Sequence, residues 1–123
     1  MYLTENFKKS EFESDDGSRM TEEILVNVTK LACNLQRLRD VLNRPIRINS
    51  GYRSIKHNKA VGGVKGSYHT KGMAADIVVE GLNPKQVANA IESLILSGEM
   101  LQGGIGIYDT FVHYDFRKKR ARW

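Results

Sequence analysis

Two histidines and one aspartate are the side chains best suited to chemistry in this chain of 123 residues. His69 and Asp76 lie within residues 67–77, and His113 lies within residues 103–117. Two imidazoles and a carboxylate suit a catalytic Zn²⁺, because three protein ligands leave a fourth position open for water. A histidine taken alone is more often structural or on the surface, so the three residues together carry the prediction of a zinc site.

Two helices are predicted from hydrophobic periodicity. The first begins at Thr21, a suitable N-cap, and its apolar residues recur at intervals of four and three. These residues are Ile24, Val28, Leu31, Leu35, Leu38 and Leu42. The second helix starts at Asn83 with Pro84 in its first position and ends at Gly98. The segment before about Met20 is polar, and we expect it to form a loop.

Four strands complete the prediction. They cover residues 45–49, 73–79, 105–108 and 111–116, and the last two form a hairpin across residues 109–110. A glycine-rich loop at residues 62–66 is expected to approach the edge of the metal site. The resulting order of helices and strands predicts an α+β fold with helices packed on a small antiparallel sheet.

Strand alternation decides which side chains share a face with the predicted ligands. In the last strand the two sets are Phe111, His113 and Asp115 on one face, and Val112, Tyr114 and Phe116 on the other. Adjacent strands can place Asp76 and His113 side by side, while Gly72 turns the loop that carries His69. We interpret Tyr108, Phe111, Tyr114 and Phe116 as hairpin core and cross-strand pairs.

Composition and charge limit the classes of protein to which this chain can belong. The chain is 41% hydrophobic, which suits a single domain over residues 1–123 without disulfide staples, and Cys33 is its only cysteine. No segment is predicted to cross a membrane or to act as an export signal. The net charge is +5, and residues 117–123 contain five cations. Such a tail favours binding to a polyanion such as nucleic acid or an anionic cell wall. The alternative is a solvated basic end that only aids solubility.

Several motifs occur in a fixed order along the chain. They are Ser50-Gly-Tyr-Arg53-Ser, His57-Asn58, Val61-Gly-Gly, Ser67-Tyr-His69-Thr-Lys-Gly72-Met-Ala-Ala-Asp76, Gly103-Gly-Ile-Gly and Phe111-Val-His113-Tyr-Asp115-Phe-Arg117. Together they resemble the M15 family of zinc peptidases, and more narrowly its short bacterial and phage-borne branch of D-alanyl-D-alanine carboxypeptidase-like proteins. The resemblance extends from the region of Phe7 to Trp123. It implies a fold like that of hedgehog proteins and D,D-peptidases.

The resemblance also implies an activity and a ligand set. The implied activity is hydrolysis of peptide bonds in peptidoglycan stem peptides, by a D,D-carboxypeptidase or an endopeptidase, with zinc held by His69, Asp76 and His113. Arg53 resembles the arginine that binds substrate and stabilises the oxyanion. Ser67 matches a serine that the family keeps two residues before the first histidine, so we expect it to bind substrate.

The general base is where this sequence departs from the family. Better-studied branches place an acid three residues before the last histidine, and Thr110 occupies that position here. We expect Asp115 to be the base or to orient a ligand, with Asp109 as the fallback base. The plainer reading of Asp115 is a surface carboxylate paired with Arg117. We interpret His57 as structural, because a fourth protein ligand would close the metal to water.

Two other functions remain open at this point. In the first, zinc only stabilises the fold, and the protein is a non-catalytic module that binds cell wall or another protein. In the second, which ranks lowest, the basic tail binds nucleic acid. We expect a monomer that is made in the cytoplasm and reaches the wall by phage-type release or on a phage particle.

Overall fold

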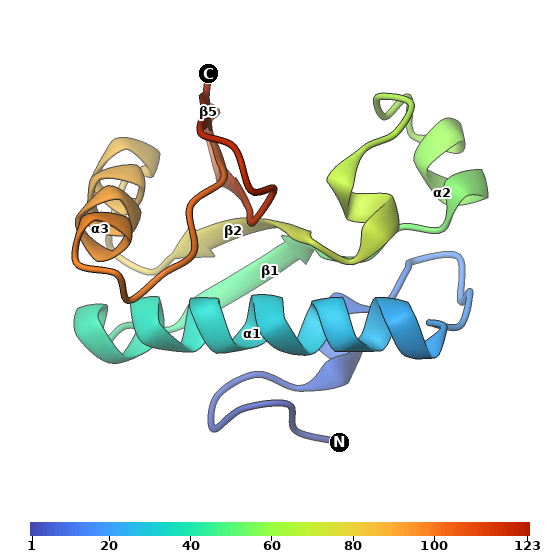
Figure 1. The fold of residues 1–123 in the computed structure, drawn as a ribbon, viewed down its shortest axis with the longest axis horizontal. Coiled ribbons are helices and arrows are strands. Elements are labelled where there is room, and N and C mark those ends of the chain that lie inside the picture. The colour runs from blue at the N-terminus through green and yellow to red at the C-terminus, as the bar shows by residue number, and fades with distance from the viewer.

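The protein forms an α+β fold, as predicted, but with three helices and a five-stranded sheet rather than two helices and four strands. The computed structural model describes all residues 1–123. In chain order the elements are η1 (Lys9–Phe12), α1 (Glu22–Leu42), β1 (Ile46–Ser50), α2 (Ile55–Ala60), η2 (Tyr68–Lys71), β2 (Ala74–Val79), α3 (Pro84–Leu96), β3 (Gly104–Ile107), β4 (Val112–Asp115) and β5 (Ala121–Arg122). Figure 1 shows α1 running the length of the molecule, with α2 and the C-terminus on the side away from it.

The sheet has the strand order β1-β2-β4-β3-β5. All neighbouring strands are antiparallel except β3 and β5, which are parallel. The predicted hairpin is confirmed as β3 and β4. Periodicity did not reveal α2, η2 or β5, because each has at most six residues, too few for a repeat.

One face of the sheet carries the hydrophobic core. Alternate residues of β2 and β4, such as Ile77 and Tyr114, are fully buried in the cluster that also contains the apolar faces of α1 and α3. The helix boundaries follow the predicted caps: the Thr21 hydroxyl accepts from the backbone N–H of Ile24, and Asn83 forms a capping box. No helix is both long and apolar enough to cross a membrane. The opposite face of β2 and β4 is left for polar residues.

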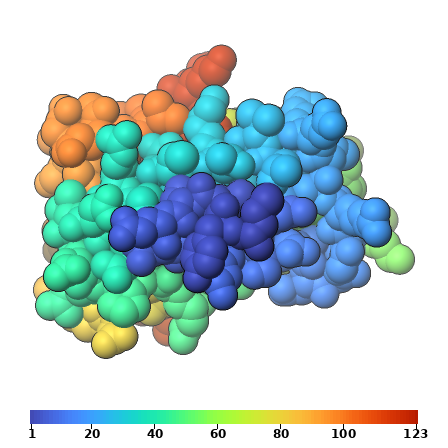
Figure 2. All heavy atoms as spheres, turned by 90° about the horizontal axis from the view of Figure 1, so that it is seen from below, coloured from blue at the N-terminus to red at the C-terminus, as the bar shows by residue number.

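The prediction of a plain loop before Met20 is wrong. Phe7 and Phe12 are buried in the core, and Phe12 is the last residue of η1. The backbone carbonyl of Phe12 accepts a hydrogen bond from the N–H of Tyr52, which lies just after β1. In Figure 2 the N-terminal residues, in dark blue, lie across the middle of the face shown. Two isolated aromatic residues in a polar segment have no periodicity, so only tertiary packing identifies them as core.

Replacing Phe12 with alanine should therefore destabilise the protein strongly. The ring has no exposed surface, and removing a buried phenyl group typically costs about 3–5 kcal/mol of unfolding free energy. Urea denaturation of the variant and of Val26→Ala, whose parent side chain is exposed, measures the difference. Equal midpoints for the two variants would contradict the assignment of Phe12 to the core.

The C-terminal segment is not a free basic tail, contrary to the sequence-based expectation. Strand β5 pairs with β3, and Arg122 forms an ion pair with Glu92 of α3 with 2.7 Å between Nε and Oε2. Arg117 binds Asp115, so only Lys118, Lys119 and Arg120 are exposed without such a partner. The last residues instead build one side of the site described next.

Candidate metal centre

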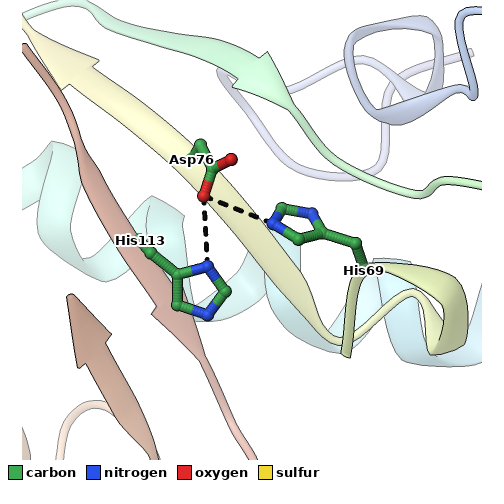
Figure 3. Close-up of side chains that lie close together, drawn as sticks. All are labelled: His69, Asp76 and His113. Carbon is green, nitrogen blue, oxygen red and sulfur yellow. Dashed lines mark hydrogen bonds and ion pairs between the residues drawn. The ribbon is translucent and has the colours of Figure 1, made fainter. Parts of the chain in front are cut away.

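His69, Asp76 and His113 converge at one point, as predicted. Oδ1 of Asp76 lies 3.3 Å from Nε2 of His69 and 3.1 Å from Nδ1 of His113. Figure 3 shows both imidazole rings turning a nitrogen toward this carboxylate. All three residues are buried, and no more than 8% of any of them is exposed.

The backbone explains why these residues meet. Asp76 and His113 are direct partners in the register of β2 and β4, so their side chains lie next to each other on the same face. His69 belongs to η2, which ends at Gly72 in the left-handed conformation with φ of 74°. A Cβ atom at Gly72 would lie 2.9 Å from Val28 Cγ2, so both the conformation and the packing require glycine. This turn directs the chain from His69 into β2.

The spacing of the donor atoms suits a metal ion. Bonds of 2.0–2.1 Å in tetrahedral geometry place ligand atoms roughly 3.3 Å apart. The two measured contacts to Asp76 are 3.3 and 3.1 Å, and all three donor atoms lie within 4.8 Å of one another. Two nitrogens and one oxygen gathered in this way could hold a divalent ion.

The second nitrogen of each imidazole is held by an acceptor. Nδ1 of His69 donates to the carbonyl oxygen of Gly51 at 2.7 Å, and Nε2 of His113 donates to Oδ2 of Asp115 at 2.7 Å. These bonds fix the ring orientation, so that on metal binding the lone pairs of His69 Nε2 and His113 Nδ1 would face the ion. Metal-ligating histidines are typically oriented in this way.

Both aspartates are ionised at neutral pH. Burial alone would raise the pKa of Asp76, but hydrogen bonds from His113 and His69 hold it well below its ordinary value. Burial also opposes ionisation of Asp115, but hydrogen bonds from His113 and Arg117 lower its pKa in the same way. Asp76 is therefore present as the carboxylate form that binds metal.

Asp115 has no exposed surface, so it is not the surface carboxylate of the plainer reading. It does pair with Arg117, as that reading expected, at 2.8 Å between Oδ2 and Nη2. Its oxygens also accept from the backbone N–H groups of Gly104 and Arg117. Asp115 contacts the nitrogen of His113 that faces away from Asp76, which is the position of an orienting residue rather than of a group beside the metal.

The other residues predicted for the site fall into two groups. Arg53 and Ser67 line the cavity beside the ligand cluster. The guanidinium of Arg53 donates to Asp76 Oδ2 at 3.4 Å, and the hydroxyl of Ser67 caps η2 by accepting from the N–H of His69. In contrast, Asp109 and Thr110 are exposed at the hairpin turn and do not line the cavity.

His57 lies outside the metal cluster, which agrees with its structural interpretation. Its Nε2 lies 3.9 Å from a carboxylate oxygen of Asp15. His57 is absent from the lining of the cavity around the ligands. The cluster therefore has three candidate metal ligands and no fourth imidazole.

The ligand cluster opens into a cavity of about 520 Å³. This volume lies within the range of roughly 300–1,000 Å³ that is usual for small-ligand sites. The glycine-rich loop forms one wall, as expected, with Gly62, Gly63 and Gly66. Asp76 is the only carboxylate among the lining residues, whereas Arg53 and Arg117 both contribute to the wall.

An aromatic wall of the cavity was missed from the sequence. The indole of Trp123 lies 5.1 Å from the His113 ring between centroids, and its Nε1 donates to the Tyr108 hydroxyl at 2.8 Å. Tyr108 and Phe111 stack at 4.5 Å and line the cavity, so they are not buried hairpin core. Tyr114 and Phe116 do belong to the core, as predicted.

Alternating glycines in β3 were the signal for this wall. Gly106 is the register partner of His113, and a Cβ there would lie 2.5 Å from the Trp123 indole. Gly104 is the partner of Asp115, and a Cβ there would lie 2.5 Å from its Oδ2. Glycines at alternate positions of a strand indicate that something approaches that face closely.

The α+β fold and a His-Asp-His group that could hold a metal ion fit a metallopeptidase. Residues 4–115 match the peptidase M15 family, so the chain belongs to this family of metallopeptidases, as the motifs predicted. It is 39% identical over 90 residues to the peptidoglycan L,D-endopeptidase MepK of Escherichia coli (strain K12), in an alignment that covers 66% of this chain and 46% of that protein. It is 35% identical over 108 residues to the probable peptidoglycan L,D-endopeptidase MepK of Haemophilus influenzae. That alignment covers 82% of this chain and 55% of that protein. The chain thus spans about half the length of the curated relatives it matches.

Proposed function

We propose that this protein is a zinc-dependent endopeptidase that cleaves stem peptides of peptidoglycan. The observation that carries the proposal is the convergence of His69, Asp76 and His113 at the base of a cavity large enough for a peptide. Two nitrogens and one carboxylate oxygen are the ligand set of several zinc peptidases. A zinc ion at such a centre lowers the pKa of a bound water and polarises the scissile carbonyl.

The residues of the chain have separate roles in this proposal. His69, Asp76 and His113 hold the metal. Arg53 keeps the carboxylate of Asp76 in place and lies where it can also donate to a substrate carbonyl oxygen. Asp115 is a positioning residue, since its contact with Nε2 keeps the other nitrogen of His113 turned to the metal.

Cleavage at an internal peptide bond, rather than removal of a terminal D-Ala, is favoured by the relatives. Both named relatives are described as peptidoglycan L,D-endopeptidases. We therefore assign the same bond class to this chain, a peptide bond between an L- and a D-configured centre. The carboxypeptidase alternative that the motifs left open would release one terminal residue instead.

Digestion of purified peptidoglycan tests this proposal. The protein is loaded with zinc, and the products are identified by mass spectrometry with and without a chelator. We expect loss of cross-linked muropeptides, no release of free D-Ala, and no reaction after metal removal. Synthetic dimers that differ only in an L,D or a D,D scissile bond then identify the bond class. Release of terminal D-Ala would support a carboxypeptidase.

One observation favours a second candidate function. The cavity wall contains no carboxylate other than Asp76, and the position of the usual acid is taken by the exposed Thr110. A site without a proton acceptor would suit a zinc-stabilised module that binds cell wall without cutting it. Binding of the zinc-loaded protein to insoluble peptidoglycan with no soluble products would support this module.

A further inference from the structure

The two arginines in the cavity wall differ in how many of their nitrogens the protein itself uses. In Arg53 all three nitrogens donate to side chains of the chain: Nε to Ser50, Nη1 to Asn58 and Nη2 to Asp76. In Arg117 only Nε and Nη2 are engaged, and both donate to Asp115. Nη1 of Arg117 therefore has no hydrogen-bond partner within the protein.

This free nitrogen is accessible. Every buried side-chain nitrogen or oxygen in the structure has a hydrogen-bond partner, so the unpaired Nη1 is not among the buried atoms. The side chain of Arg117 is 26% exposed and lines the cavity. An arginine held on one edge with its other edge open is arranged to bind an anion from solution.

The position of the Arg117 guanidinium is well defined. Its Cζ lies 4.4 Å from the centre of the Tyr68 ring and 5.2 Å from that of Trp123. These aromatic contacts and the paired hydrogen bonds to Asp115 hold the guanidinium plane before any ligand arrives. A preorganised donor loses little conformational entropy on binding, so it contributes more to affinity and specificity.

The charge around the cavity also favours an anionic ligand. Asp76 is the only side-chain carboxylate in the wall, and in the proposed function it binds the metal. The buried carboxylate of Asp115 offsets one positive charge, and Arg53 and Arg117 are both in the wall. Lys71 adds a further positive charge, with Nζ 4.9 Å from the Tyr68 ring centre. Arg117 contacts Asp115, which contacts His113, so an anion bound to Arg117 would lie in the same cavity as the candidate metal ligands.

We propose that Arg117 is a specificity-determining residue, whose free Nη1 binds a carboxylate of the peptide substrate next to the scissile bond. The inference rests on the proposed function, because it assumes that the cavity receives a peptide. It assigns recognition of the carboxylate to Arg117. Arg53 supports Asp76, and the second N–H of its Nη1 or Nη2 is the donor available to the oxyanion. In wall peptides such a carboxylate is either the C-terminal group or an internal one left free by the branching of the stem.

The test compares peptides that differ only in one carboxylate. The acidic stem peptide, the same peptide amidated at its C-terminus and the same peptide amidated at its internal carboxylates are given to the zinc-loaded protein. We expect one amidation to lower kcat/KM by roughly 10- to 100-fold, the effect of losing a hydrogen bond to a charged group. Which amide is affected identifies the source of the carboxylate.

Variants then locate this preference. In Arg117→Gln the ratio of kcat/KM for acid over amide should fall to about one, whereas Lys118→Gln, which removes the same charge from an exposed position outside the cavity, should keep it. If Arg117→Gln does not fold, Arg117→Lys is used. A lysine ammonium can still donate to Asp115, but it lacks the planar guanidinium that offers a second edge to a carboxylate, so the preference should again fall. Because acid and amide are compared on the same variant, a change in metal binding affects both alike.

The outcomes separate this inference from the proposed function. Equal rates for all three peptides with the unaltered protein, or an acid preference that persists in both Arg117 variants, would overturn the role of Arg117. If no peptide is cleaved, the endopeptidase proposal fails. Titration calorimetry with the same peptides then tests the role of Arg117. The acid peptide should bind the unaltered protein more tightly than the amide does, and this difference should disappear in the Arg117 variants.

Discussion

Asp76→Ala is expected to abolish both metal binding and peptide hydrolysis. Asp76 is the residue to which both histidines point, and its Oδ1 is the only carboxylate oxygen among the three donors. Without it the site keeps two imidazoles, and the bound zinc measured by elemental analysis should fall from about one per chain toward zero. The loss of a Lewis acid removes several kcal/mol of transition-state stabilisation, so hydrolysis should fall by at least about 10³-fold.

Asp109→Ala is the matched control for this variant. It removes an equal charge from the exposed turn between β3 and β4, outside the cavity. We expect unchanged zinc content and nearly unchanged kcat. A large loss of kcat with full zinc content in Asp109→Ala would show instead that this carboxylate reaches the reacting bond. Normal zinc content in Asp76→Ala would refute the three-ligand centre.

Asp115→Asn is expected to weaken zinc binding without removing a ligand. The buried carboxylate orients His113 through its Nε2 and is itself held by Arg117. Loss of such an orienting partner typically lowers metal affinity or activity by about 10- to 100-fold. Hydrolysis measured against zinc concentration should therefore need more metal for half-maximal rate and should recover much of the original kcat at saturation.

This zinc dependence distinguishes the two roles that the sequence left open for Asp115. If Asp115 were the general base, kcat would stay low at saturating zinc, because excess metal cannot replace a proton acceptor. Glu92→Gln is the control, since it removes a carboxylate paired with another arginine, Arg122, away from the ligands. We expect its zinc dependence to match that of the unaltered protein.

The elements that hold the site were largely readable from the sequence. Long amphipathic helices and alternating strands follow local periodicity, and α1, α3 and the β3–β4 hairpin lie close to their predicted bounds. Strand alternation also placed His113 and Asp115 on one face, away from Tyr114. The ligand set came from spaced motifs, and the donors of His69, Asp76 and His113 do lie within 4.8 Å of one another.

The surroundings of the ligands depend on contacts between distant segments. The carbonyl of Gly51 holds His69 across 18 positions of the chain, and no local pattern marks that oxygen as an acceptor. In the same way, a segment that reads as a basic tail becomes a sheet strand because β3 offers a free edge, and its Trp123 covers His113 because Gly106 leaves room.

Residue types and their order along the chain were thus enough to name three candidate donors, through motifs, and the secondary structure that carries them, through short-range periodicity. The burial of Asp115, the commitment of every nitrogen of Arg53 and the free edge of Arg117 emerged from the folded chain. They depend on which groups are left over after long-range hydrogen bonds have formed. The unpaired groups can be identified only when all hydrogen-bond partners are in their folded positions.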